Sequence, residues 1–375
     1  MNFNAELLQC FRMLLAASTC ETDTVTEWDL ATQYGDHTKA LNICKKRAMQ
    51  GEAAAQNHLG TLYETGQGVP RDYSLALKWY SAAAAMGNAQ AQISLGVMYE
   101  TGEGGSQDHG LAVKWYSASA KGGDVIAQVR LGILYENGEI VPQDYSLAFK
   151  WYSAAAEQGD MFSQDRLGVL YETGQGVPQD YSLAFKCYSV ASEDGTASAK
   201  RNLGFLYEKG KGVPQDYSLA YKWYSEAAEQ GDEPAHYLLG KMYTNGHGVP
   251  QDNVLALSWY LEAAELGCVP ALYKLGMMYE SGNGVPQDYS LAFKWYSEAA
   301  EEGAASAQYN LGDLYSNGRG VPADKVQAYA WFSVAGSNGY ELGQKSRDEV
   351  STNMTPSAIE KGQQLANEIR AQLGT

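Results

Sequence analysis

One dipeptide, Leu-Gly, returns at a constant spacing through most of this chain and limits what the chain can fold into. Eight of its copies, from Leu59-Gly60 to Leu311-Gly312, lie 36 residues apart in succession without insertion or deletion. A tyrosine follows three residues after each of these glycines. Self-similarity with a period of about 20–50 residues marks arrays in which each small unit is stabilised by its neighbours. The sequence therefore predicts a repeat array instead of a single globular core.

The order of apolar and turn residues within one unit predicts two helices. The apolar residues of segment 55–63 are spaced for one face of a helix, and Gly66 follows where a positive φ can end that helix. Asp72 then stands where its carboxylate can accept the first unpaired amides of a second helix, which is expected to end at Gly87. Each unit is therefore predicted to be a helical hairpin.

A glycine inside the first helix also recurs in every copy. Gly60 should cost roughly 1 kcal/mol relative to alanine in a helix interior, so we expect a steric reason for it. The simplest reason is that a Cβ there would collide with the large ring of Trp79 or of its neighbour. Because one hairpin cannot cover its own apolar stripe, the hairpins must stack. We predict an all-α fold, a right-handed α/α solenoid of eight 36-residue hairpins at residues 52–87, 88–123, 124–159, 160–195, 196–231, 232–267, 268–303 and 304–339.

Both ends of the array are predicted to be capped. Residues 21–51 are expected to form an N-terminal cap, in which 37–51 match the second helix of a partial unit. Residues 340–375 depart from the repeat and are predicted to be C-terminal capping helices, with Thr355 as an N-cap and Pro356 in the first helical position. Residues 1–20 leave two alternatives open, a signal peptide and an N-terminal helix. Segment 13–18 is apolar, but Glu6 precedes it and Arg12 is the one basic residue there.

Charge and cysteine content exclude several classes of protein. The 44 acidic and 27 basic side chains leave a net charge of -17, which opposes nonspecific binding to nucleic acid or to an anionic membrane. No run of about 20 apolar residues is available to span a bilayer. The 5 cysteines are irregularly spaced and contain no CxxC, which argues against a disulfide ladder or a zinc knuckle and favours buried or incidental thiols.

The repeated motifs resemble those of a known family. The segments Ala91-Gln-Ile-Ser-Leu-Gly-Val-Met-Tyr and Ala292-Phe-Lys-Trp-Tyr-Ser-Glu-Ala-Ala resemble the Sel1-like repeat, and the resemblance covers about three quarters of the chain. The tail segments Arg347-Asp-Glu-Val and Met354-Thr-Pro-Ser-Ala-Ile-Glu are similar to the closing helices of bacterial members. The size and the eight repeats are similar to those of a member by which bacteria enter host cells.

The resemblance implies a non-enzymatic adaptor that assembles other proteins. Several bacterial relatives act on infected host cells, so an exported or secreted location, in the periplasm or the host cell, is expected, and a cytoplasmic one if the leader is not a signal. Some cysteine-rich relatives carry a disulfide in every repeat and have been linked to β-lactam binding. This chain lacks those cysteine pairs, which puts that role in doubt.

The chain offers no residue pattern for catalysis or for cofactor binding. Its 5 histidines form no HExxH pair and no other ligand pair spaced i, i+4. The GxG loops continue into Val-Pro and follow a predicted helix where a phosphate-binding loop would follow a strand. The aspartates of the Asp72 column recur once per repeat, which suits N-caps and not a catalytic acid. We therefore predict no catalytic residue, no metal ligand and no cofactor.

Positions that vary between repeats on the outward face of the first helix form the candidate partner-binding surface. Apolar and aromatic side chains occupy most of these positions, and basic ones lie between them, which is typical of partner sites for peptides carrying carboxylates or phosphates. The predicted binding residues are Val97, Val129, Arg130, Ile133, Arg166, Val169, Arg201, Phe205, Tyr237, Lys241, Tyr273, Lys274, Met277 and Tyr309. Two alternatives stay open: the apolar groups could fill space between adjacent first helices, and the basic groups could be solvated charges.

These residues support hypotheses from two classes of protein. In the first, a monomeric, curved solenoid binds partner proteins or peptides, host trafficking proteins among them, on its concave face, and Arg166→Glu and Phe205→Ala weaken this binding. In the second, the same basic residues form a receptor for a small ligand or make weak contact with anionic lipid. A periplasmic adaptor for bacterial envelope complexes is a further alternative.

Overall fold

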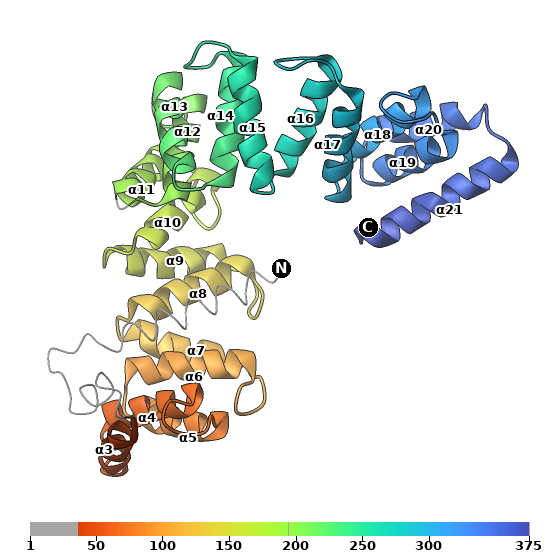
Figure 1. The fold of residues 1–375 in the computed structure, drawn as a ribbon. Helices are drawn as coiled ribbons and strands as arrows, with labels where there is room; N and C mark the ends of the chain where they lie inside the picture. The colour runs from red at the N-terminus through yellow and green to blue at the C-terminus, as the bar shows by residue number, and fades with distance from the viewer. Residues whose placement is uncertain (1–36, 194, 375) are drawn as a thin grey trace. The chain divides into compact units, whose positions relative to one another are not determined.

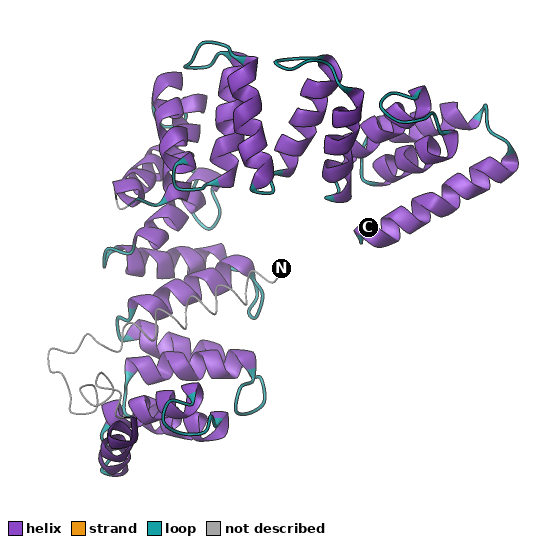
Figure 2. Cartoon of the chain, viewed as in Figure 1, coloured by secondary structure: helices purple, strands orange, loops and turns teal. Residues whose placement is uncertain are grey.

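The computed structural model describes residues 37–193 and 195–374, and the regular secondary structure of these residues is entirely helical (Figure 1; Figure 2). The expectations for residues 1–20 and for 21–36 lie outside the described residues. The first helices of the eight repeats are α4 (Ala53–Thr65), α6 (Ala89–Thr101), α8 (Val125–Asn137), α10 (Met161–Thr173), α12 (Ala197–Lys209), α14 (Glu233–Asn245), α16 (Val269–Ser281) and α18 (Ala305–Asn317). The second helices are α5 (Tyr73–Ala85), α7 (His109–Lys121), α9 (Tyr145–Ala156), α11 (Tyr181–Glu193), α13 (Tyr217–Ala228), α15 (Asn253–Glu265), α17 (Tyr289–Glu301) and α19 (Lys325–Ser337).

The chain divides into two compact units, Met1–Val190 and Ala191–Thr375, which are described separately. Within each unit, successive helices pack side by side: α4 packs on α5 and α5 on α6, and α16 packs on α17 and α17 on α18. Each unit is a right-handed α/α solenoid, because every hairpin buries its apolar stripe against the next one.

Both predicted stop and start signals of a hairpin are present. In the third repeat, α8 ends at Gly138, whose φ of 73° is left-handed and whose N–H donates to the carbonyl of Leu134. The next helix begins at Asp144, whose carboxylate accepts from the backbone N–H groups of Ser146 and Leu147, both at 3.0 Å. The aspartates at the same position of the other seven repeats also cap their helices, which confirms the prediction of N-caps.

The glycine inside each first helix faces an aromatic ring of its own hairpin. A Cβ on Gly132 would lie 2.4 Å from Cε1 of Tyr152, and one on Gly60 would lie 2.7 Å from Cδ1 of Tyr80. The expected steric conflict is therefore confirmed, and the ring is the tyrosine that follows the tryptophan, not the tryptophan itself. Because the two helices cross at this glycine, the ring of the second helix packs directly on the backbone of the first.

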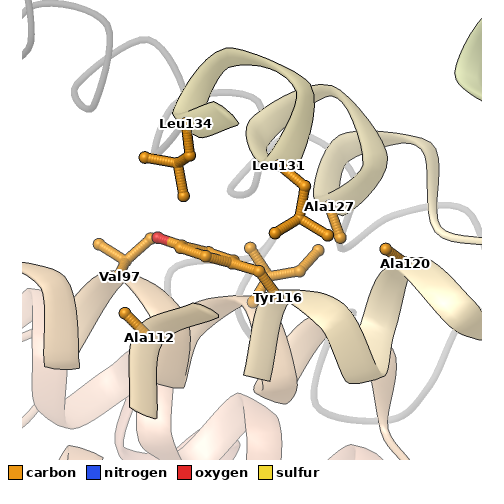
Figure 3. Close-up of a cluster of buried hydrophobic side chains, with 8 residues drawn as sticks. Val97, Ala112, Tyr116, Ala120, Ala127, Leu131 and Leu134 are labelled. Carbon is orange, nitrogen blue, oxygen red and sulfur yellow. The ribbon is translucent and has the colours of Figure 1, made fainter. Parts of the chain in front are cut away.

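The tryptophans contribute to the contact between repeats. Trp115 packs on the core that joins the first two repeats, and Trp151 packs on the core around Tyr116 and Leu131. In that core the ring of Tyr116 lies between residues of its own repeat and Leu131 of the next (Figure 3). The aromatic rings therefore contribute to the packing of one repeat on the next.

Helices outside the eight repeats cover the terminal hairpins. α3 (His37–Met49) packs on α4, as the second helix of a partial unit would. At the other end, α20 (Glu341–Ser351) and α21 (Pro356–Leu373) both pack on α19. Ala366 and Ile369 of α21 bury the apolar side chains of Ala330 and Val334, and Thr355 caps α21 by accepting from the N–H of Ala358. The described part of the N-terminal cap and the C-terminal cap therefore both consist of helices that pack on the terminal hairpins.

Candidate partner-binding surface

Three of the predicted binding residues in the first unit are buried. Val97 lies in the core with Leu131 of the following repeat (Figure 3), and Ile133 packs in the next core with Leu167. Arg130 is only 1% exposed. The expectation of an exposed position is wrong for these three, because successive first helices lie close enough that each side chain fills the space between them. For Val97 and Ile133 the space-filling alternative is the right one.

The buried guanidinium of Arg130 has a specific ion-pair partner. Its Nη2 donates to the carboxylate of Glu100, one repeat earlier, and the other oxygen of Glu100 accepts from the hydroxyl of Tyr116 at 2.8 Å. Glu100 is itself only 8% exposed. The two charges therefore neutralise each other inside the fold, and neither is available to a partner. Burial, followed by the Glu100 charge, raises the pKa of Tyr116 well above its ordinary value, which keeps the hydroxyl protonated as the donor.

This tyrosine–glutamate contact recurs along the array. Arg166 adds a cation in the same way, donating to Glu136 at 2.5 Å, although it remains 28% exposed. The tyrosine–glutamate pairs are Tyr80–Glu64, Tyr116–Glu100, Tyr152–Glu136, Tyr188–Glu172, Tyr224–Glu208 and Tyr296–Glu280. The sequence analysis did not predict this series of tyrosine–glutamate pairs, called the ladder below, although six of the eight repeats carry a glutamate four residues after the repeated glycine. The predicted residues Val129 and Val169 lie beside it and are half-buried.

In the second unit the predicted aromatic residues line successive first helices. Phe205, Tyr237, Tyr273 and Tyr309 come from α12, α14, α16 and α18, and all four are half-buried. The last three pack at a tilt on the ring that faces the helix glycine of their own hairpin, with centroids 5.8, 5.7 and 5.3 Å apart. Met277 of α16 is 39% exposed. Tyr237 and Tyr273 are therefore each fixed by one ring and half-buried, whereas Tyr309 also packs on the ring of Tyr340, with centroids 4.9 Å apart.

Cationic side chains accompany these rings. The ammonium groups of Lys211 and Lys209 lie 5.2 and 6.0 Å from the ring centre of Phe205, and that of Lys241 lies 5.8 Å from the ring centre of Tyr237. Arg201 is held by Asp232 at 3.2 Å. The basic residues are thus ordered by rings and carboxylates, and the alternative of a set of purely solvated charges is wrong for Arg201 and Lys241.

The carboxylate of Glu208 lies within this group of cations. Burial alone would raise its pKa, but hydrogen bonds from Lys209 and Tyr224, together with the charges of Lys209 and Lys241, outweigh that effect and lower it. Glu208 is therefore ionised at neutral pH and offsets part of the local positive charge.

Three predicted residues of α16 border a pocket of about 270 Å³ in the second unit. Tyr273, Lys274 and Met277 form one side of it, and side chains of α14, α15, α17 and α18 complete the lining, among them Thr244, Tyr260, Tyr296 and Asn310. The structure therefore brings together a cation, a thioether and several rings at one place on the first-helix face.

The described residues offer neither a metal site nor a helix that could span a membrane. Among residues 37–193 and 195–374, no three histidine, cysteine, aspartate or glutamate side chains are placed to hold a metal ion. No helix in these ranges is both long and apolar enough to cross a bilayer. Cys44 and Cys268 are buried, as interpreted from the sequence, and burial raises the pKa of the Cys187 thiol to about 11 and that of Cys268 to about 12.

The stacked hairpins and the ring-lined first helices define an α-solenoid repeat protein. The chain belongs to the Sel1 repeat family, whose profile matches residues 53–88, 89–124, 125–160, 162–196, 197–232, 233–268, 269–303 and 305–340. Members of this family are generally scaffolds for protein–protein interaction.

Two solved structures are similar over most of the chain. A Sel1 repeat protein from Oxalobacter formigenes is 30% identical, with a TM-score of 0.73 over 88% of this chain and 95% of its own. The protein c5321, described as a protective antigen present in uropathogenic Escherichia coli strains and displaying an SLR fold, is 29% identical, with a TM-score of 0.51 over 98% of this chain and 95% of its own. No protein of curated function matches the chain.

Proposed function

We propose that this protein is a non-enzymatic adaptor that binds a partner protein on the first-helix face of its second unit. The observation that carries the proposal is the row of half-buried rings on α12, α14, α16 and α18, with lysines beside Phe205 and Tyr237. Aromatic side chains fixed on one side lose little entropy on binding, and they dominate the energetics of many protein interfaces.

The face is less suited to a small metabolite or to a bilayer than to a polypeptide. Its rings extend along four successive first helices instead of converging on one deep cavity, so a long ligand can use more of them. Its cations alternate with the carboxylates of Glu208 and Asp232, so an anionic membrane would meet charges of both signs.

Phe205→Ala and Tyr237→Ala are expected to release the partner. Each variant removes one ring from the face, and we expect the affinity for the captured protein to fall about tenfold or more in each case. The measurement is affinity capture from cell lysate with the full chain, followed by titration of a captured protein. Val254→Ala is the control, because Val254 is 60% exposed on a second helix.

The control variant should retain the partner, and far-UV circular dichroism should show that all three variants are folded. Retention of the same proteins by both ring variants contradicts the proposed surface. A third outcome indicates the lipid receptor instead. In it, no protein is captured, the wild type binds liposomes of phosphatidylserine, and both ring variants lose that binding. Arg166→Glu would disturb the array itself, because Arg166 pairs with Glu136 of the preceding repeat.

We further propose that the adaptor acts as an exported bacterial protein that engages proteins of a host cell, trafficking proteins among them. The similarity to the protective antigen of uropathogenic Escherichia coli supports this proposal. We expect the mature protein, isolated from fractionated bacteria, to be found outside the cytoplasm and to lack about the first 20 residues. Mass measurement of its N-terminus checks this, and an intact N-terminus in the cytoplasmic fraction contradicts it.

A further inference from the structure

The pocket of the second unit lies where the tyrosine–glutamate ladder is interrupted. In the sixth repeat Thr244 occupies the position that glutamate holds in the other ladder repeats, and its hydroxyl lies 3.1 Å from that of Tyr260. Thr244 and Tyr260 both line the pocket. The pocket wall therefore carries a threonine where the other ladder repeats have a glutamate.

The same interruption leaves a cation without its usual partner. Arg130 and Arg166 each pair with a glutamate 30 residues earlier, and Lys274 stands in the same register, 30 residues after Thr244. In the part of the chain that the structure describes, no carboxylate lies within ion-pair distance of Lys274. Its ammonium makes one weak contact, 4.0 Å to the sulfur of Met277. An ammonium that borders a pocket and has no carboxylate of its own favours an external carboxylate.

The rest of the lining sets the shape of the ligand. Met277 and Tyr273 offer an adaptable thioether and a ring beside Lys274. Glu280 lies in the same pocket, with one oxygen holding the hydroxyl of Tyr296 at 2.7 Å. A ligand with several negative charges would meet Glu280, whereas a single carboxylate followed by neutral groups would not. The second oxygen of Glu280 can accept from a peptide N–H.

We propose that this pocket binds an acidic side chain of a partner peptide, with its carboxylate on Lys274 and the adjoining apolar side chain against Met277 and Tyr273. The volume of about 270 Å³ suits one or two side chains and not a whole folded element. The inference rests on the proposed adaptor function and names the chemistry of its partner: an exposed segment in which aspartate or glutamate stands next to an apolar residue.

A dipeptide with one charge tests the pocket directly. The methyl groups of the methionines in the full chain are labelled with ¹³C, and Met277 is assigned with Met277→Leu. Titration with N-acetyl-Glu-Phe-amide should shift the signals of Met277 and Met278, with a Kd of about 1 mM. N-acetyl-Gln-Phe-amide should bind about tenfold more weakly, because the hydrogen bond to Lys274 loses its charge.

Thr244→Glu gives the decisive variant, because it restores the ladder. The new carboxylate would pair with Lys274 and Tyr260 as Glu136 pairs with Arg166 and Tyr152, so the fold should be retained while dipeptide affinity falls about tenfold or more. Lys274→Met should have the same effect on binding. Ser258→Glu adds an equal charge at an exposed position of α15 and should leave the titration unchanged.

Three results would overturn the inference: equal affinity for the two dipeptides, no shift of the Met277 and Met278 signals on titration, or unchanged dipeptide affinity of the Thr244→Glu variant. The adaptor proposal is judged separately, by partner capture with the ring variants. If those variants lose the partner while the dipeptide titration fails, the adaptor function stands and the acidic-peptide assignment falls. If capture survives in them, the proposed face itself is wrong.

Discussion

Arg130→Met is expected to lower the free energy of unfolding by about 3–5 kcal/mol, the usual cost of removing one member of a buried ion pair. The carboxylate of Glu100 would keep its hydrogen bond from Tyr116 but lose its cation while remaining almost inaccessible to water. Urea unfolding followed by circular dichroism measures the loss. Hydrogen exchange locates it, and protection should fall first in α6–α9, because the contacts of a repeat array are made between neighbours.

Two further variants show whether the lost charge pairing is responsible. Glu100→Gln combined with Arg130→Met removes both charges and should recover most of the stability, since a buried pair replaced as a whole is often neutral. Arg166→Met should cost clearly less than Arg130→Met, because Arg166 is 28% exposed and water can solvate the remaining Glu136. A change of less than about 0.5 kcal/mol for Arg130→Met, the size of an ordinary surface substitution, would contradict the account.

Gly132→Ala is expected to destabilise the first unit by about 1–3 kcal/mol, the usual cost of overpacking, although alanine is the better helix former. The added Cβ would lie 2.4 Å from Cε1 of Tyr152, a ring that is buried on all sides and holds Glu136 through its hydroxyl. The ring cannot move without opening α8 from α9. Thermal unfolding should show a lower Tm, and hydrogen exchange should show reduced protection in both helices.

Gly105→Ala is the matched control for this substitution. Gly105 has no positive φ, and an added Cβ would make only an ordinary contact, 3.6 Å from a methyl group of Leu77. Its effect should stay within about 0.5 kcal/mol. Equal stability of Gly132→Ala and the wild type would show that the helix glycines are not required by the ring.

The hairpins were predictable from sequence because their signals are local. A helix end needs a residue that accepts a positive φ, as at Gly138, and a helix start needs a side-chain acceptor, as at Asp144. Both requirements act within a few residues, and eight copies make them unmistakable. The steric role of Gly60 was also predictable, although the choice between the tryptophan and the tyrosine beside it required the crossing of the two helices.

The candidate site was predicted less well, because exposure depends on the neighbouring repeat. Val97, Ile133, Phe205 and Met277 stand at the same position of their repeats, yet Val97 and Ile133 are buried and Met277 is 39% exposed. The prediction of exposed binding residues fails for Val97, Arg130 and Ile133. Whether the remaining residues bind a partner stays a prediction.

The sequence alone determined that this protein is a stack of eight helical hairpins, since the period, the glycine stops and the aspartate caps each act over a short stretch of chain. Only the tertiary structure decided which cations form ion pairs within the stack and which have no carboxylate partner there and can bind a ligand. Arg130 pairs with Glu100, 30 residues earlier, whereas the residue 30 positions before Lys274 is Thr244, which carries no charge. The energy of each cation depends on the side chain that the preceding hairpin places opposite it, and on how much water reaches the pair.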